Sequence, residues 1–599
     1  MIVFLLFRYH GRKSVCSCLW PKKTDSTGPP ERSVIPCMTG RQKVLLTPRY
    51  YLDNFQYVLD FVKRLYGGLL NDAEWDFVRR FETLSLDAQC LYVRFSNRKG
   101  LFFRVNKVQY REITDVPAAV GELLMAGFIE RLSARHGIMG DDALGVFTKP
   151  ELLELLPLEP EEVRSLNKEK KEGVVQYALH ELNFAEIVTS LTTRETVIRM
   201  NFEAQGMMVK YLFFGNRDGS MTDFVVRDLG MVNFERYDES RMTARFRTRK
   251  EVEDKLLISL TNEEFYDLKT AEAPADDIYN WFLNWNETRP ELTEIAIPGY
   301  QKLVCRVGAF LERQKLPEQA LAVYELSDRV PARERRVRLL FKNGSVEEAL
   351  ALCDEIAVKP LNAEERYFAN DFREKILSAG EKKKSRKATT RFLSDAESVD
   401  IPAAYRHHVE AGVMNHYLEQ GYDAAFTENY PWRGLFGLVF WDIIYDANVS
   451  AIHHPLQRAP SDFYLPDFYL KREDMLKKRL TDLTTKDDWR LQTGRMFNAK
   501  YGITNVLVDW SDELLGLVHR MIELLDIEQL RLILLEMARN VREHTRGFPD
   551  LLIWNGQGEY DFVEVKSPTD HLGPQQLHWL EFFHTIGVRG KVMRVVWEA

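Results

Sequence analysis

The sequence has no apolar run long enough to cross a membrane, few cysteines, and no excess of basic residues. A membrane-spanning helix needs about 18 or more consecutive apolar residues, and none occurs, so we expect no membrane partner. Six cysteines in 599 residues do not make a disulfide framework. The 81 Lys and Arg are outnumbered by 89 Asp and Glu, a net charge of −8. This balance excludes a uniformly basic nucleic-acid binder, but a basic groove can still lie on an acidic chain.

The length and composition indicate a folded protein of several modules. At about 150 residues per domain, 599 residues correspond to four domains or one elongated array. Aromatic residues make up 12% and charged residues 28%, which argues against wholesale disorder. Residues 1–40, rich in Lys, Arg, Ser and Pro, are predicted to be a disordered extension, and Met38 begins a conventional-looking start. Cys16 and Cys18 lack the two-residue gap of a zinc knuckle, so we expect no zinc site there.

Residues 41–115 are predicted to form a helix-and-hairpin module that binds DNA. Apolar residues recur at helical spacing from about Tyr50, and a segment that mixes basic with aromatic and β-branched side chains follows. Such interleaving is typical of a nucleic-acid-binding surface. A solvated amphipathic hairpin explains the segment equally well. The candidate DNA contacts are Arg94, Arg98, Lys99, Arg104 and Lys107.

Residues 116–395 read as helices. In residues 116–200, Thr148 precedes Pro150 as an N-cap precedes a first-turn proline. Within residues 201–395, the segment that starts at Glu318 (Glu-Gln-Ala-Leu-Ala-Val-Tyr-Glu) is echoed at Glu347 (Glu-Glu-Ala-Leu-Ala-Leu-Cys-Asp). Repeated helix hairpins of this kind predict a tetratricopeptide-like array that spaces the modules on either side. The basic run at residues 381–387 is typical of a linker, and it could also contact phosphates.

The pattern that carries chemistry lies between Asp550 and Lys566. Two apolar runs flank Asn-Gly-Gln-Gly, which predicts a β-hairpin. Since strand side chains alternate between faces, Glu564 and Lys566 project from the same side of the second strand. Asp550 opens the first strand and can lie opposite them. Two carboxylates and a lysine then converge at one end of a small sheet.

Such a group can bind a hard divalent cation. Asp550 and Glu564 would supply oxygen ligands of the kind Mg²⁺ prefers, leaving positions for water and a phosphate oxygen. Lys566 could orient the attacking water or stabilise charge on the phosphate. The alternative is structural, with Glu564 and Lys566 as a cross-strand ion pair and Asp550 capping a turn. Buried apolar neighbours on both flanks favour the metal site.

These residues resemble a known nuclease core. Pro549-Asp550, a spacer and Glu564-Val-Lys566 resemble the PD-(D/E)XK core, and with Gly547-Phe548 and Gln576-Leu-His-Trp579 they resemble its VRR-NUC branch. The order of modules, including a SAP-like DNA-binding segment at residues 116–200, resembles the Fanconi-associated nuclease family over residues 45–599. The resemblance implies a mainly α chain, with helical N-terminal modules and a tetratricopeptide-like helical array. An α/β PD-(D/E)XK nuclease domain would follow at residues 396–599.

The resemblance also implies roles for individual residues. Asp550 and Glu564 match metal-binding acids, Lys566 the catalytic lysine, and the Val565 carbonyl an additional ligand for Mg²⁺ or Mn²⁺. Glu428, before a helix that ends Trp441-Asp-Ile-Ile, matches a further metal-binding acid that its own surroundings would not reveal. Arg542 and Gln576 are expected to contact DNA. The remaining histidines are expected to support neighbouring site residues or to lie on the surface, and not to bind metal: His544, His571 and His578.

The implied function is that of a structure-specific DNA nuclease. The resemblance implies 5′-flap endonuclease and 5′-to-3′ exonuclease activity in interstrand-crosslink repair, by a monomer for which dimerisation on DNA stays open. No ubiquitin-binding zinc finger is evident, and the bacterial-type chain implies a cytoplasmic, nucleoid-associated location. Two alternatives remain: a four-way-junction resolvase of the same core, and a helical-repeat scaffold that binds DNA without cutting it.

Overall fold

The computed structural model describes residues 46–378, 393 and 396–598. The chain divides into two compact units, Met1–Val232 and Asn233–Ala599. The predictions for residues 1–40, including Cys16 and Cys18, and for the basic run at residues 381–387 fall outside the described residues. In the part that is described, no helix is both long and apolar enough for a membrane crossing.

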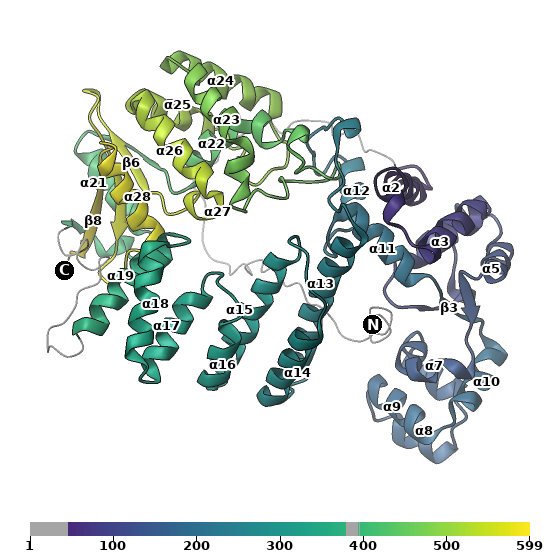
Figure 1. Ribbon diagram of the computed structural model, residues 1–599. Helices are drawn as coiled ribbons and strands as arrows, with labels where there is room; N and C mark the ends of the chain where they lie inside the picture. The colour runs from purple at the N-terminus through teal and green to yellow at the C-terminus, as the bar shows by residue number, and fades with distance from the viewer. Residues whose placement is uncertain (1–45, 379–392, 394–395, 599) are drawn as a thin grey trace. The chain divides into compact units, whose positions relative to one another are not determined.

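The first unit is mainly helical, with three short strands (Figure 1). Aromatic rings of its first three helices form the centre of its core, where Phe55, Phe81 and Tyr92 contact one another edge to face. The elements are α2 (Tyr50–Tyr66), α3 (Asp72–Thr83), α4 (Leu86–Ser96), β1 (Phe102–Arg104), α5 (Val116–Met125), β2 (Ile129–Arg131), α6 (Gly140–Gly145), α7 (Lys149–Leu155), α8 (Pro160–Leu166), α9 (Lys171–Glu181), α10 (Phe184–Arg194), β3 (Val197–Met200), α11 (Glu203–Phe214) and α12 (Thr222–Asp228).

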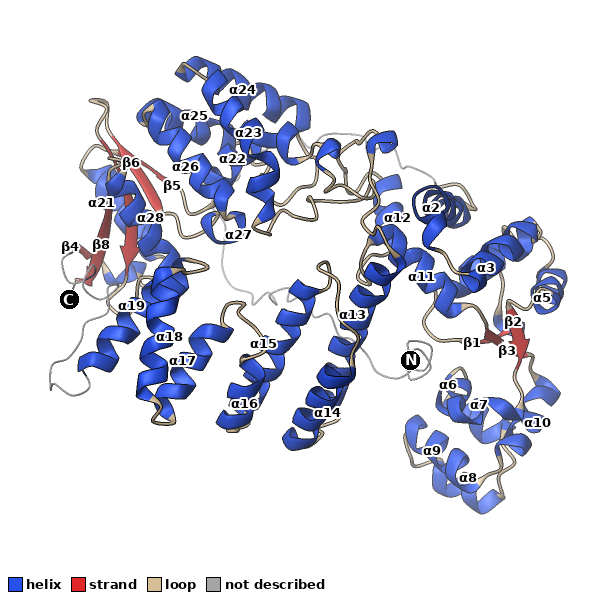
Figure 2. Cartoon of the chain, in the orientation of Figure 1, coloured by secondary structure: helices blue, strands red, loops and turns tan. Residues whose placement is uncertain are grey.

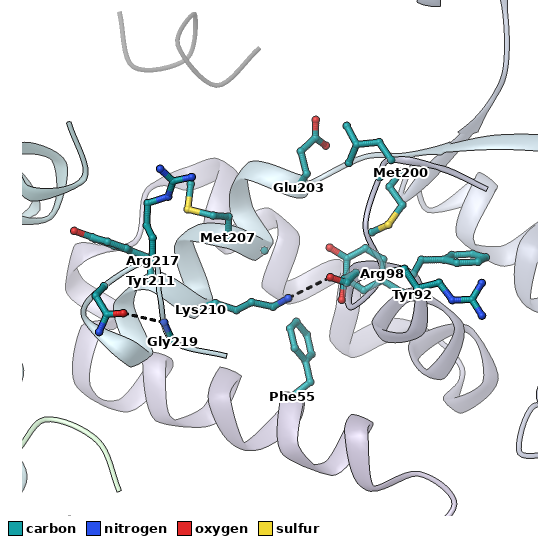
Figure 3. A pocket seen from close by; sticks show the side chains of 16 residues that line it. Phe55, Tyr92, Arg98, Met200, Glu203, Met207, Lys210, Tyr211, Arg217 and Gly219 are labelled. Atoms are coloured by element: carbon teal, nitrogen blue, oxygen red, sulfur yellow. Dashed lines mark hydrogen bonds between the residues drawn. The ribbon is translucent and has the colours of Figure 1, made fainter. Parts of the chain in front are cut away.

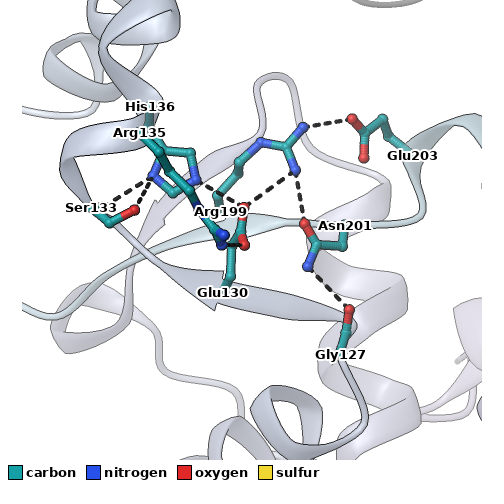
Figure 4. Close-up of polar contacts among 8 residues, drawn as sticks. All are labelled: Gly127, Glu130, Ser133, Arg135, His136, Arg199, Asn201 and Glu203. Carbon is teal, nitrogen blue, oxygen red and sulfur yellow. Dashed lines mark hydrogen bonds and ion pairs between the residues drawn. The ribbon is translucent and has the colours of Figure 1, made fainter. Parts of the chain in front are cut away.

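The three strands form one antiparallel sheet in the order β1-β3-β2. The local hairpin expected after residue 91 is not formed. Instead, β1 pairs with β3, which lies about 95 residues later in the chain. An isolated pair of such short strands would be unstable, and the third strand, β2, completes the sheet. On β3, Arg199 donates to Asn201 at 2.8 Å and to Glu203 at 2.7 Å (Figure 4). It also lies 3.7 Å from Glu130 of β2, so the buried guanidinium ties the sheet to α11.

Capping residues set several helix starts. The N-cap Asn71 and Glu74 bond each other's backbone at the start of α3, and Thr148 and Glu151 do the same at α7, as the Thr-Lys-Pro sequence predicted. A cap of this kind stabilises a helix by about 1 kcal/mol, since it satisfies N–H groups that have no partner within the helix.

The second unit begins with a row of antiparallel helices (Figure 1). The two echoing segments both fold as helices, α16 and α18, which confirms their predicted helical character. The last helix of the row, α19, packs on α28 (Pro574–Thr585) of the C-terminal part, where Tyr367 donates to Glu581 at 2.5 Å. The helices are α13 (Arg249–Thr270), α14 (Ala275–Thr288), α15 (Ile297–Arg313), α16 (Pro317–Tyr324), α17 (Ala332–Lys342), α18 (Val346–Val358) and α19 (Ala363–Ser378).

The C-terminal part is a five-stranded mixed sheet with helices on both faces, which confirms the predicted fold class (Figure 2). The strand order is β4-β8-β7-β6-β5, with β4, β8 and β7 parallel and β6 and β5 antiparallel to their neighbours. The elements are β4 (Glu397–Ile401), α21 (Val409–Glu419), β5 (Asp423–Phe426), α22 (Tyr430–Ile444), α23 (Asp467–Asp482), α24 (Lys486–Lys500), α25 (Leu514–Leu524), α26 (Ile527–Arg539), α27 (Val541–His544), β6 (Leu551–Trp554), β7 (Tyr560–Lys566), α28 (Pro574–Thr585) and β8 (Gly590–Trp597).

Strand alternation divides β7 between two cores. Val563 and Val565 pack with α21 on one face of the sheet. Phe562 packs on the other face with aromatic residues of α22 and α28. Because side chains alternate along a strand, Glu564 and Lys566 point to the same face as Phe562. The site is therefore built where β7 ends beneath α28.

Candidate active site

Asp550, Glu564 and Lys566 lie together at one end of the β6–β7 hairpin. Leu551 pairs with Val563, which brings Asp550 beside the end of β7. One carboxylate oxygen of Asp550, Oδ2, accepts a hydrogen bond from the Val565 N–H at 2.8 Å. The β-hairpin that the Asn-Gly-Gln-Gly turn predicted is thus formed.

Glu564 and Lys566 are in direct contact beneath α28. Glu564 is fully buried, and its Oε1 lies 2.6 Å from the Lys566 Nζ. The same oxygen accepts a hydrogen bond from the Gln576 side chain of α28 at 2.5 Å. The Gln576 carbonyl in turn accepts from the Gly573 N–H at 2.8 Å, which anchors the amide at the start of the helix. Gln576 therefore holds Glu564, and its amide nitrogen is directed at the carboxylate.

The two buried acids have strongly raised pKa values. Burial is the main cause, and it raises the pKa of Asp550 to about 6, with a further contribution from the negative charges of Glu428 and Glu410. Burial and the charge of Asp550 raise the pKa of Glu564 to about 8, although Lys566 opposes the shift. Two carboxylates that are this costly to ionise form a site that favours a cation.

The predicted acid Glu428 is brought to this site by a loop from far away in sequence. The loop joins β5 to α22, and the Thr427 N–H donates to the Asp550 carbonyl at 2.7 Å. The Asn429 side chain accepts from the Phe548 N–H at 3.3 Å. Glu428 is exposed and lies between the two residues that make these hydrogen bonds, and its charge raises the pKa of both Asp550 and Glu564. The structure therefore groups Glu428 with the two buried acids.

A column of aromatic rings supports the loop that carries Asp550. Phe548 stacks between Trp432 of α22 and Trp579 of α28, with ring centroids 4.6 and 4.0 Å apart. Gly547 just before it has φ +83°, and a Cβ there would lie 2.6 Å from the Gln575 side chain. Only glycine fits this close approach without strain. The loop is thus fixed by packing on both sides.

Arg433 and Arg542 lie near Tyr464, and Arg329 lies near Arg542. Arg542 donates to the Tyr464 carbonyl at 3.4 Å and lies 5.7 Å from the centre of its ring. Burial raises the pKa of the Tyr464 hydroxyl, and the positive charges of Arg433 and Arg542 oppose this shift. Burial and the charge of Arg542 lower the pKa of Arg329, from the row of helices. Arg542 was predicted from the sequence, whereas Arg329 and Arg433 were not. A buried cation whose pKa is lowered by a neighbouring cation favours an anionic ligand such as phosphate.

Two of the basic residues predicted in the first unit are held by acids. Arg104 is buried, and its guanidinium donates to Glu151 at 2.7 Å and to Glu195 at 2.6 Å. Arg94 donates to Glu112 and lies over the Tyr51 ring at 3.9 Å. These contacts give Arg104 a structural role and leave little of Arg94 for a phosphate.

The other three predicted residues of that unit are exposed. Arg98 lies 5.4 Å from the centre of the Tyr110 ring, Lys99 follows it in the same turn, and Lys107 is 3.8 Å from Glu151. Beside Arg98 is a cavity of about 270 Å³ into which Lys210 extends from α11, with its ammonium donating to the Ser96 carbonyl at 3.3 Å (Figure 3). Burial lowers the pKa of Lys210 to about 8. An anion entering this cavity would stabilise the ammonium.

Four charged residues that the sequence did not predict are brought to their sites by the tertiary fold. Glu410, Arg329, Arg433 and Lys210 lie on four different helices in the structure or beside them. None belongs to a local motif, and charged residues at helical spacing are normally solvated. Only the tertiary fold brings them to a site.

The donor set at Asp550 fits a divalent cation. The second carboxylate oxygen of Glu564, Oε2, is buried and has no hydrogen-bond partner. With Asp550 and Glu428, it offers the oxygen ligands that hard cations prefer. A metal bound there would supply Lewis acidity and lower the pKa of a bound water.

Comparison with known proteins identifies two matching family models and several related nucleases. Two family models match the chain: "FAN1, HTH domain" over residues 49–130 and "VRR-NUC domain" over residues 485–597. The Fanconi-associated nuclease 1 homolog of Pseudomonas aeruginosa is 29% identical over 561 residues, which cover 89% of this chain and 93% of that protein. The Oryza sativa homolog is 25% identical and the human protein 23%, and the chain spans only 64% and 62% of their lengths.

Solved structures agree with the sequence comparisons. The crystal structure of paFAN1 bound to DNA with a two-nucleotide 5′ flap and a gap has a TM-score of 0.77 and 27% sequence identity, and the match covers 93% of this chain and 99% of that one. Together, the fold and the site define a divalent-metal-dependent DNA nuclease with a VRR-NUC domain. In sequence and in fold, the chain is similar to the Fanconi-associated nucleases over most of its length.

Proposed function

We propose that this nuclease cuts DNA at 5′ flaps, has 5′-to-3′ exonuclease character, and acts in the repair of interstrand crosslinks on chromosomal DNA in the cytoplasm. The observation that carries the proposal is the buried group of Asp550, Glu564 and Lys566, with Glu428 clasped beside it. The related paFAN1 structures, which contain 5′-flap DNA, support the choice of substrate.

In this proposal, Asp550, Glu564 and Glu428 bind Mg²⁺ or Mn²⁺, with the Val565 carbonyl as a further ligand. The Val565 N–H fixes the Asp550 carboxylate, and Gln576 fixes Glu564. The Lys566 ammonium lies 2.6 Å from the Glu564 Oε1, and this contact would hold it next to the scissile phosphate. There it orients the attacking water and stabilises the negative charge that develops on the phosphate oxygens. All these groups come from one chain, so we propose that a monomer cuts.

Substrate recognition would rest on phosphates. The charge of Arg542 lowers the pKa of Arg329, and a phosphate bound there would relieve the repulsion between them. Arg433 and Arg542 both lie near Tyr464 and could bind the same phosphate strand. In the first unit, we propose that the exposed Arg98, Lys99 and Lys107 contact duplex DNA. Contacts with phosphates carry no sequence information, which suits an enzyme that recognises structure. They also require affinity to fall steeply as salt rises.

The test is cleavage of labelled DNA substrates by the full chain. A 5′ flap, a 3′ flap and a four-way junction of matched sequence are incubated with Mn²⁺, with Mg²⁺ or with chelator. We expect metal-dependent cutting with the 5′ flap preferred. Preference for the four-way junction would make the chain a junction resolvase with the same chemistry. DNA binding without cleavage under either metal would leave only a scaffold and overturn the proposal.

A further inference from the structure

A second group of potential metal ligands lies behind the nuclease site. Glu536 of α26, His544 of α27 and His578 of α28 place one ligand atom each within 4.8 Å of one another. The Glu536 Oε1 lies 3.4 Å from the His544 Nδ1 and 3.3 Å from the His578 Nε2. All three side chains are nearly nine-tenths buried, with 11 or 12% exposed. The sequence spacing of these residues gave no sign of this convergence.

The separations match the edge of a metal coordination shell. Metal–ligand bonds of about 2.0–2.1 Å at a tetrahedral angle place neighbouring ligand atoms about 3.3 Å apart. Direct N–H···O hydrogen bonds are shorter, at about 2.7–3.2 Å. The His578 Nε2 is indeed buried with no hydrogen-bond partner. An unpartnered imidazole nitrogen thus faces a carboxylate oxygen across a gap that one ion would bridge.

The surrounding contacts support a ligand role for all three residues. The Arg539 side chain donates to Glu536 Oε2 at 3.1 Å, which leaves Oε1 directed at the histidines and orients the carboxylate as an outer-shell partner does. His544 Nδ1 is 2.7 Å from the Glu536 carbonyl, so an ion at Nδ1 would replace the proton shared with that carbonyl. The two rings are stacked with centroids 4.5 Å apart at 17°, and both would turn about their side-chain bonds to bring their nitrogens onto one ion.

The charge states are also suitable. Burial raises the pKa of Glu536, but the close contact with His578 and the charges of both histidines outweigh burial and bring it to about 2. Burial lowers the pKa of His544. Near neutral pH, the group therefore offers an ionised carboxylate and a neutral His544 imidazole, the protonation states that metal ligands require.

We propose that Glu536, His544 and His578 bind one transition-metal ion of the Zn²⁺ class. Two imidazoles and a carboxylate suit Zn²⁺, whereas the all-oxygen set at Asp550 suits Mg²⁺ or Mn²⁺, so the two sites are chemically distinct. The ion would join α26, α27 and α28. Because α27 leads into the loop that carries Asp550, and α28 carries Gln576, the bound ion would stabilise both sides of the nuclease site.

The test measures zinc in the full chain while the nuclease site is saturated with Mg²⁺. Chelator-treated protein is incubated with Zn²⁺ and excess Mg²⁺ and dialysed, and its zinc content is measured by mass spectrometry. We expect one zinc per chain in the wild type, in Asp550→Asn and in His571→Ala, which changes an exposed histidine just before α28. We expect none in His544→Ala or His578→Ala.

A second measurement covers the case in which an alanine variant fails to fold. Co²⁺ replaces Zn²⁺ in folded wild type and in the more conservative His578→Gln, and its visible absorption reports nitrogen ligation. A band in the wild type and in Asp550→Asn that is lost in His578→Gln supports the site. Absence of zinc and of the band in the wild type would overturn the proposal. So would zinc that is retained by both histidine variants or lost in Asp550→Asn.

Discussion

In the absence of metal, the carboxylate of Asp550 should destabilise the fold at alkaline pH, and Asp550→Asn should remove this effect. Folding raises the pKa of Asp550 from 3.8 to about 6. Each pKa unit corresponds to about 1.4 kcal/mol, so the shift of roughly 2 units is worth about 3 kcal/mol. Because the folded pKa is the higher one, the protonated form is favoured. The contribution of the protonated Asp550 carboxyl to stability is complete below about pH 4 and is lost as pH rises through 6.

The variant should therefore behave oppositely with and without metal. In chelator at pH 8, we expect Asp550→Asn to have a free energy of unfolding about 3 kcal/mol above that of the wild type, with no difference near pH 4. The gain could be larger, because the charge of Asp550 also raises the pKa of Glu564. With saturating Mn²⁺ the order should reverse, since the ion binds the ionised wild type more tightly and stabilises it by mass action.

The assay is urea denaturation of the full chain, followed by tryptophan fluorescence, at pH 4, 6 and 8. Trp432 and Trp579 stack on the loop that carries Asp550, so they report on this part of the fold. A matched control is Asp561→Asn, on the same hairpin but paired with Arg589 at 3.0 Å. If Asp550→Asn were less stable than wild type in chelator at pH 8, the assignment of a buried, metal-free charge would be wrong.

Three further predictions concern positioning, packing and DNA binding. Gln576→Ala should lower metal-dependent cleavage about 10- to 100-fold, since a hydrogen bond to a charged group is worth about 1.5–3 kcal/mol, whereas Gln575→Ala should have a smaller effect in the same single-turnover assay. Gly547→Ala should lower the free energy of unfolding by about 1–3 kcal/mol in urea denaturation, because of its positive φ and the close contact, and unchanged stability would contradict this packing. Arg98→Ala should weaken DNA binding and reduce the salt slope by about 1 in fluorescence titrations, whereas Arg104→Ala should reduce stability and leave the slope unchanged.

Local patterns in the sequence were enough to predict the hairpin at the centre of the site. The Asn-Gly turn after residue 554 fixes the register of β6 and β7, and strand alternation then places Glu564 and Lys566 on one face. The helical character of the echoing segments also follows from local periodicity, as does the capping box at Thr148.

Long-range pairing explains what the sequence did not reveal. Glu428 is an exposed loop acid that reaches the site only because its neighbour Thr427 bonds to Asp550, more than 120 residues away. The basic residues Arg94 and Arg104 looked like DNA contacts because their acidic partners come from elsewhere in the chain. The expected hairpin beside them failed for the same reason, since its strand pairs with β3.

The proposed mechanism requires that Asp550, Glu564 and Lys566 form the catalytic group. Single-turnover cleavage of a 5′-flap DNA with saturating Mn²⁺ tests this requirement. We expect Asp550→Asn and Lys566→Met each to cut at least about 10³-fold more slowly than wild type, because each loses stabilisation of the transition state. The affinity for the flap, measured in parallel in chelator, should stay within about threefold of wild type, a change of under 1 kcal/mol. Cleavage at the wild-type rate by either folded variant would show that the chemistry takes place elsewhere in the chain.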